Sequence, residues 1–149
     1  MPSISRRRTL GASPEDVWAV VSDPERLPAW WPLVTRVEEA TPEAWTEVLA
    51  SPRRKVVRAD FTLVESDPLR RRVWQQEVAE TPFERLLAAS SRTVELEPER
   101  DGSTSVRITV DHHPRGWARL AFVQLRRATV RQVEEALDGL EALFERRGD

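Results

Sequence analysis

The sequence has 149 residues, of which 40% are hydrophobic and 32% charged, values typical of one globular domain with a substantial core. Its formal net charge of −2 gives no electrostatic reason to expect nucleic-acid or anionic-membrane binding. The absence of cysteine excludes disulfides, thiol catalysis and thiolate metal sites, and no apolar run is long enough for a signal peptide or a membrane span. We therefore expect a single cytoplasmic domain over residues 1–149.

The first elements along the chain are a strand and two short helices. Residues 3–10 alternate loosely and predict a strand. Ser13 is a common N-cap residue and Pro14 is tolerated in a first helical turn, so the two predict a helix start. Asp23-Pro24 ends this helix, because the residue before a proline disfavours the helical conformation. The prolines that follow confine the next residues to one further short helix.

Six later segments have the features of strands. They are residues 34–39, 45–50, 55–65, 70–78, 92–97 and 105–112. The third of them places Ala59, Phe61 and Leu63 on one parity and polar residues on the other, which is typical of a sheet with one wet face. Residues 80–90 fit a helical turn as well as a strand, so their structure stays open.

Residues 117–146 predict one long helix. Val133, Leu137 and Leu140 recur at three- and four-residue steps, and charged residues occupy the opposite side. Gly139 costs about 1 kcal/mol relative to alanine in a helix, a cost that close packing of the sheet on the helix would offset. One face of the helix is therefore expected to grip the core.

Two motifs after the first predicted strand carry a family resemblance. They are Ser-Pro-Glu-Asp-Val-Trp at 13–18 and Ser-Asp-Pro-Glu-Arg-Leu-Pro-Ala-Trp-Trp-Pro at 22–32. The sequence resembles the START-like superfamily called SRPBCC, especially its polyketide cyclase/dehydrase and lipid-transport branch. That resemblance implies an α+β helix-grip fold, like that of the plant pollen allergens. In such a fold a curved seven-stranded antiparallel sheet wraps around a long C-terminal helix, with two short helices after the first strand. It also implies a cavity between sheet and helix that is open to apolar ligands.

Strand parity predicts which polar side chains face that cavity. His112, Arg92 and Gln76 each share the parity of apolar neighbours on the same strand, so we expect them to point inward. A buried polar side chain needs a partner, which a ligand oxygen can supply. The alternative is that His112 lies near solvent at a strand end and that Arg92 pairs with a carboxylate at the rim.

Large aromatic side chains are the predicted apolar walls, since flat rings suit stacking against a ring-bearing ligand. Trp30 and Trp31 are not expected to face inward together, so one of them should border the entrance, and Trp45 is a further wall candidate. The alternative is that the rings simply fill the core. The predicted lining of the cavity comprises Trp30, Trp31, Phe61, Trp74, Gln76, Arg92, His112 and Trp117.

Little in the sequence indicates catalysis or metal binding. We find no nucleophile–base pair, phosphate-binding glycine loop or dinucleotide fingerprint, and expect no cofactor. His112 and His113 point to opposite faces of a strand and cannot chelate one ion together, so no metal is expected. The strand parity of Glu47 is ambiguous, so the sequence does not decide whether its side chain points inward or outward. The arginine runs at 6–8 and 70–72 are interpreted as solvated edge charges.

The leading hypothesis is a protein that binds a small hydrophobic or aromatic metabolite, lipid- or polyketide-like, between the sheet and the C-terminal helix. The alternative is a polyketide aromatase/cyclase/dehydratase-type enzyme in which His112 or Arg92 moves a proton or polarises a carbonyl. A second alternative is a co-chaperone-like protein-interaction module. The expected partner is a small apolar or aromatic ligand, with no nucleic acid and no membrane insertion, bound by a monomer or weak homodimer.

Overall fold

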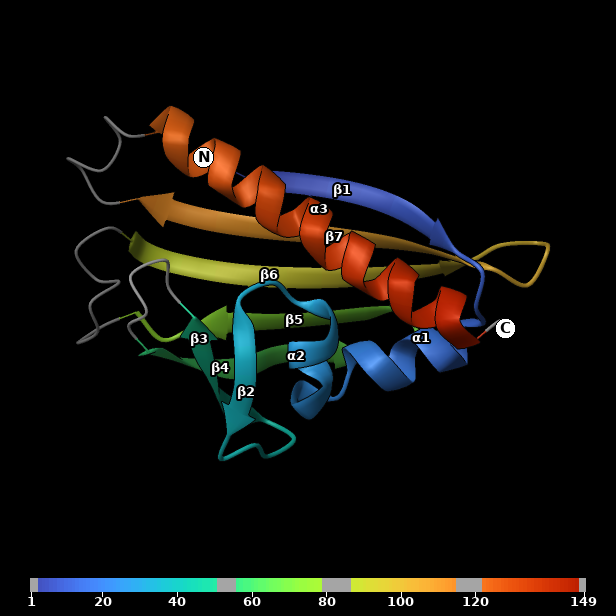
Figure 1. The fold of residues 1–149 in the computed structure, drawn as a ribbon, viewed down its shortest axis with the longest axis horizontal. Coiled ribbons are helices and arrows are strands. Elements are labelled where there is room, and N and C mark those ends of the chain that lie inside the picture. The colour runs from blue at the N-terminus through green and yellow to red at the C-terminus, as the bar shows by residue number, and fades with distance from the viewer. Residues whose placement is uncertain (1–2, 51–55, 79–86, 115–121, 148–149) are drawn as a thin grey trace.

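A computed structural model of the chain describes residues 3–50, 56–78, 87–114 and 122–147 (Figure 1). The strands are β1 (Ser3–Leu10), β2 (Val34–Glu38), β3 (Ala44–Ala50), β4 (Val56–Asp67), β5 (Arg71–Gln76), β6 (Leu87–Pro98) and β7 (Thr104–Pro114). The helices are α1 (Pro14–Val21), the 3₁₀ turn η1 (Pro24–Arg26), α2 (Leu27–Trp30) and α3 (Phe122–Arg147).

The strands form one antiparallel sheet in the order β1-β7-β6-β5-β4-β3-β2, and α3 runs diagonally across one face of it (Figure 1). Helix α2 packs against α3. This arrangement confirms the predicted helix-grip fold. Residues 117–121 and 80–86 lie outside the described residues, while strand β6 begins at Leu87 and so includes the end of the segment left open. None of the described helices combines the length and apolar composition that a bilayer crossing requires.

Local capping fixes the two short helices where the sequence predicts them. The Ser13 Oγ accepts a hydrogen bond from the Asp16 backbone N–H at 3.2 Å, and Pro14 occupies the first turn of α1. At the other end of α1, Asp23 caps the 3₁₀ turn by accepting from the Glu25 backbone N–H at 3.1 Å. The starts of α1 and the 3₁₀ turn are therefore each satisfied by a side chain directly before them, whereas α2 continues from the 3₁₀ turn without a side-chain cap.

The core lies between the sheet and α3. Val133, Leu137 and Leu140 on α3 are completely buried, as are Ile108 and Val110 on β7. Burying each such side chain contributes roughly 1.5–3 kcal/mol, so this seam holds the helix in the sheet's concave face.

Gly139 explains how closely α2 approaches α3. A Cβ atom on Gly139 would lie 2.8 Å from the Trp30 Cα and 3.0 Å from the Trp30 carbonyl carbon. Close packing does offset the helix cost of this glycine, but the packing partner is the backbone of α2 and not the sheet. Only a residue without a side chain lets the two helices meet at this distance.

The prediction that the first arginine run consists of solvated edge charges holds for Arg7, which is exposed on the edge strand β1, but not for Arg8. Ile4, Arg6, Arg8 and Leu10 share one parity of β1, which faces α3. The Arg8 guanidinium contacts three carboxylates of the helix, those of Glu134, Asp138 and Glu141. The hydrogen bond to Asp138 raises the pKa of Arg8, although partial burial opposes the shift. Arg8, and Arg6 through Glu134, therefore fasten the edge strand to the long helix.

Candidate functional site

The inner face of the sheet carries a cluster of aromatic rings. The edge of one ring meets the face of the next at 5.4 Å between Trp30 and Trp31 and at 6.3 Å between Trp31 and Trp74. Trp45 stacks on Phe61 with ring centroids 6.2 Å apart. Each of these five side chains is at most 3% exposed. The predicted wall candidates thus lie together, except for Trp117, which lies outside the described residues.

Trp30 and Trp31 both face the interior, which corrects the prediction that only one of them does so. Trp30 is the last residue of α2, and Trp31 has the extended dihedrals φ −87° and ψ 130°. The rule that consecutive side chains point in different directions applies within one regular helix or strand. Because the backbone changes from helical to extended between these two residues, both rings turn toward the core.

A buried ion pair crosses this aromatic cluster. The Nη1 of Arg92 donates to both carboxylate oxygens of Glu47 at 3.0 Å, and the Trp45 Nε1 donates to Glu47 Oε2 at 3.2 Å. The Arg92 guanidinium also lies over the rings of Trp31 and Phe61, 4.3 and 4.4 Å from their centroids. Glu47 is completely buried, so the side chain whose parity the sequence left ambiguous points inward. Arg92 does pair with a carboxylate, but in the core and not at the rim.

His112 pairs with a serine on the neighbouring strand. Its Nδ1 lies 2.9 Å from the Ser90 Oγ, and the two residues face each other in the β6–β7 register. Burial, followed by the positive charge of Arg92, lowers the pKa of His112 to about 4, so the imidazole is neutral at neutral pH. No described carboxylate forms an ion pair with it. Sequence reasoning missed Ser90 because it lies in the segment whose strand character was open, although it shares the parity of Arg92.

Arg72 is the second buried guanidinium, and its burial contradicts the interpretation of the 70–72 run as solvated charges. Its side chain shares the inward parity of Trp74, is 5% exposed and lies over the Trp45 ring at 5.6 Å from the centroid. Burial lowers the pKa of Arg72, while the charge of Asp23 acts in the opposite direction. The parity of the predicted strand 70–78 already places Arg72 on the same face as Trp74, but the interpretation as solvated charges gave the charge precedence over the parity.

Four buried nitrogens of this interior have no hydrogen-bond acceptor in the described part of the chain. They are the Nε1 atoms of Trp30, Trp31 and Trp74, and the Nε2 of Gln76. Trp74 and Gln76 lie two residues apart on the same face of β5, and Gln76 faces Phe61 in the β4–β5 register. A buried N–H without a partner costs roughly 1–3 kcal/mol. The interior therefore offers donors that a bound molecule with acceptor oxygens would satisfy.

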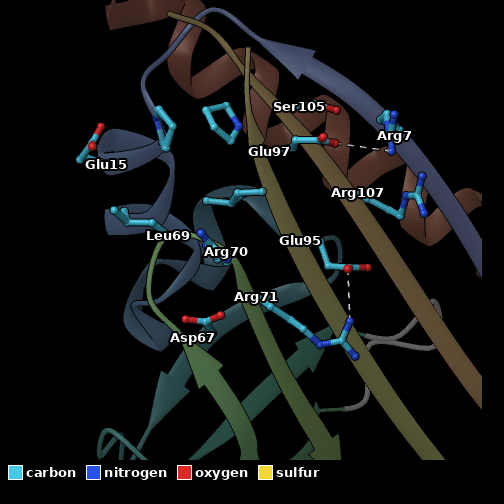
Figure 2. Close-up of a pocket in the computed structure, with 13 residues that line it drawn as sticks. Arg7, Glu15, Asp67, Leu69, Arg70, Arg71, Glu95, Glu97, Ser105 and Arg107 are labelled. Atoms are coloured by element: carbon cyan, nitrogen blue, oxygen red, sulfur yellow. Dashed lines mark ion pairs between the residues drawn. The ribbon is translucent and has the colours of Figure 1, made fainter. Parts of the chain in front are cut away.

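A separate groove lies on the face of the sheet turned away from α3 (Figure 2). It has a volume of about 620 Å³ and is lined by acidic and basic side chains in mixture, together with Pro14, Leu69, Leu96 and Pro98. Arg71 pairs with Glu95 at 3.2 Å and Arg7 with Glu97 at 4.0 Å across it, and all four are well exposed. Exposed pairs of this kind contribute little to stability or to recognition. None of the predicted site residues lines this groove, so the candidate site is the aromatic interior.

Solved structures of known proteins share this fold. A START superfamily protein from Mycobacterium smegmatis matches with a TM-score of 0.76 and 14% identity, over 97% of each chain. The di-domain ARO/CYC BexL from the BE-7585A biosynthetic pathway matches with a TM-score of 0.78 and 21% identity, over 95% of this chain and 46% of that one. The di-domain ARO/CYC StfQ from the steffimycin pathway gives 0.74 and 19%, over 99% and 51%. At these identities the likeness shows the fold alone.

A comparison with curated proteins finds no match. The family model described as polyketide cyclase / dehydrase and lipid transport, however, matches residues 1–145, nearly the whole chain. This match agrees with the helix-grip architecture and with the strand, double-helix and proline pattern of the first 32 residues. The chain belongs to the polyketide cyclase / dehydrase and lipid transport family.

Proposed function

We propose that the protein binds a small hydrophobic or aromatic molecule, lipid- or polyketide-like, between the sheet and α3. The observation that carries this proposal is the set of four buried N–H donors without acceptors beside the aromatic cluster. Trp31 and Trp74 supply flat apolar surface, and their ring nitrogens and the Gln76 amide hold oxygen atoms of the ligand in place. Such a ligand has rings or chains with carbonyl or hydroxyl groups.

The empty and the occupied interior differ in the free-energy cost of their unsatisfied donors. Each unsatisfied donor costs roughly 1–3 kcal/mol, and four of them together make a large fraction of the stability of a domain this size. Ligand oxygens that accept from these donors recover that cost, so binding and stability are coupled. The description of the family, which names polyketide cyclases and lipid transport, and the ARO/CYC names of BexL and StfQ support a ligand of this class.

Native mass spectrometry of freshly purified protein, followed by solvent extraction, tests the proposal. We expect a mass increment that survives gentle ionisation and is released on denaturation. A protein that stays at 17.1 kDa, and whose melting temperature no flat aromatic compound raises, would instead favour the protein-interaction module.

A substitution that removes one donor but keeps an aromatic ring tests the role of the orphan nitrogens. Trp74→Phe should weaken binding of the extracted ligand by about five- to tenfold, since one hydrogen bond is lost. Trp18→Phe is the matched control, because Trp18 lies half-buried on α1, outside the aromatic cluster. Equal losses in the two variants would contradict the proposed role of the Trp74 N–H.

An enzyme of the cyclase or dehydratase type is the second candidate, favoured by the Ser90–His112 contact at 2.9 Å. Two features weigh against it. A His112 pKa of about 4 makes the imidazole a weak base at neutral pH, and Arg92 is already bound to Glu47. His112→Gln separates the two functions. An enzyme would lose roughly 10²–10⁴-fold in turnover with little change in affinity, whereas a binding protein shows no turnover in either form.

A further inference from the structure

The buried charges of the interior do not balance. In the described part of the chain the buried charged side chains are Glu47, Arg72 and Arg92. Glu47 and Arg92 neutralise each other through the contact at 3.0 Å. The positive charge of Arg72 is therefore left over, on the inward face of the sheet.

Few contacts within the protein compensate the buried positive charge of Arg72. Its guanidinium lies over the Trp45 ring at 5.6 Å, and a cation–π contact recovers only part of the cost of removing a guanidinium from water. No described carboxylate forms an ion pair with it. Asp23, whose charge acts on Arg72, accepts from the Glu25 backbone N–H at 3.1 Å and lies 3.6 Å from the Arg26 Nε. That carboxylate is committed to the 3₁₀ turn.

The neighbours of Arg72 add hydrogen-bond donors and no carboxylate that is free to pair with it. Trp74 follows it two residues later on the same face of β5, with its Nε1 unpartnered, and Gln76 follows Trp74 in the same way. The one buried carboxylate, Glu47, already accepts from Arg92 and Trp45. An excess positive charge beside a row of donors complements a ligand that is negatively charged and rich in acceptor oxygens.

We propose that the ligand of this interior is a flat organic anion, an aromatic carboxylate or a compound with an equally acidic oxygen, whose negative group is bound by Arg72. Its rings lie against Trp45 and Trp74, and its remaining oxygens accept from the unpartnered donors. This inference rests on the proposed function and narrows it from apolar molecules in general to acidic ones.

Pairs of probes that differ only in charge provide the test. They are 2-naphthoate and 2-naphthamide, and the corresponding acid and amide of anthracene, titrated calorimetrically into the full chain near neutral pH. The carboxylate and the amide have nearly the same shape, but only the carboxylate is charged. We expect at least one carboxylate to bind about tenfold or more tightly than its amide.

Three variants assign the preference to Arg72. Arg72→Met keeps the length of the side chain and removes the charge, so the carboxylate should fall to the affinity of the amide. Arg72→Lys keeps the charge and should retain most of the preference. Arg107→Met is the control, because it makes the same change of net charge at an exposed residue of the outer groove and should leave the preference intact.

The outcomes distinguish the two proposals. If the unmodified chain binds carboxylate and amide equally well, the proposal that the ligand is an anion is wrong, while the proposed function still stands. No binding of any probe overturns both. A preference that survives Arg72→Met, or that Arg107→Met abolishes as well, overturns the role of Arg72. If Arg72→Met does not fold, the comparison of probes on the unmodified chain and on Arg72→Lys still decides.

Discussion

Arg92 on β6 reaches Glu47 on β3, although β5 and β4 lie between these strands in the sheet. Neighbouring strands are about 4.8 Å apart, so on a flat sheet the two backbones would be about 14 Å apart and both side chains would stand perpendicular to the sheet instead of pointing toward each other. The Nη1 nevertheless lies 3.0 Å from both oxygens of Glu47. The concave curvature of the sheet therefore brings the two side chains together, and the pair in turn stabilises that curvature.

The stability of the domain should depend on this pair. Glu47→Gln keeps the shape of the side chain but leaves the buried Arg92 unpaired, so the free energy of unfolding should fall by about 3–5 kcal/mol. Urea unfolding monitored by tryptophan fluorescence measures the change. Glu95→Gln is the control, because Glu95 pairs with Arg71 on the exposed face and should cost less than about 1 kcal/mol.

The double variant Glu47→Leu with Arg92→Met sharpens the same test. It replaces both charges by apolar groups, so it should recover most of the stability that Glu47→Gln loses. A double variant as unstable as the single one would show that packing, and not charge, accounts for the effect.

Periodicity predicted the strands and the long helix, and the family resemblance implied their arrangement as a helix-grip fold. Residues such as Phe61 on β4 and Leu137 on α3 lie where the alternation and the helical spacing place them, since both elements bury one regular face. The capping of α1 by Ser13 was equally local and equally predictable.

Parts of the candidate site were not predictable from local pattern. Glu47 is buried because Arg92, 45 residues later in the sequence, neutralises it. Charge alone made Arg72 look solvated, although its strand parity places it inward. The two inward rings of Trp30 and Trp31 depend on a change of backbone conformation at the end of α2. For Glu47 and the two tryptophans, a tertiary contact or an irregular backbone overrides the rule that works within one element. For Arg72 the parity rule holds, and only the expectation that a charged side chain is solvated fails.

Gly139 should not tolerate a side chain. Gly139→Ala gains up to about 1 kcal/mol of helix propensity, but its Cβ would meet the backbone of Trp30, which is less able to move than a side chain. We expect a net loss of about 1–3 kcal/mol and a lower melting temperature. Gly11→Ala, where an added Cβ meets no atom within 4 Å, should change the stability by less than about 0.5 kcal/mol. A stabilised Gly139→Ala variant would contradict the close approach of α2 and α3.

Arg8 should fasten β1 to α3 through charge. Arg8→Gln leaves Glu134, Asp138 and Glu141 close together on the helix without their common cation, and should cost about 1 kcal/mol at low salt. Added salt should reduce the difference from the unmodified protein, because it screens both the attraction and the repulsion. Arg7→Gln is the control, since among the described residues the ion pair of Arg7 is with Glu97 on the outer face, at 4.0 Å, and not with α3. A loss that is the same at all salt concentrations would indicate packing of the Arg8 stem instead.

The buried His112 should make the free energy of unfolding depend on pH. Burial and the charge of Arg92 lower its pKa from 6.5 to about 4, so the unfolded chain binds a proton in this range that the folded protein does not. The free energy of unfolding therefore holds its full value above pH 6.5 and falls as the pH drops toward 4. The full difference amounts to about 3 kcal/mol.

His112→Gln isolates this contribution from that of the carboxylates. Glutamine does not titrate and can still bond to Ser90, so the variant should lose less stability than the unmodified protein between pH 6.5 and pH 4. The difference between the two proteins should change by about 3 kcal/mol across the window, because the titration of the carboxylates is common to both and cancels. Urea unfolding at a series of pH values measures it. Parallel stability curves for the two proteins would mean that the imidazole takes up its proton as readily in the folded state as in the unfolded one, and that His112 is not held in the neutral form by the core.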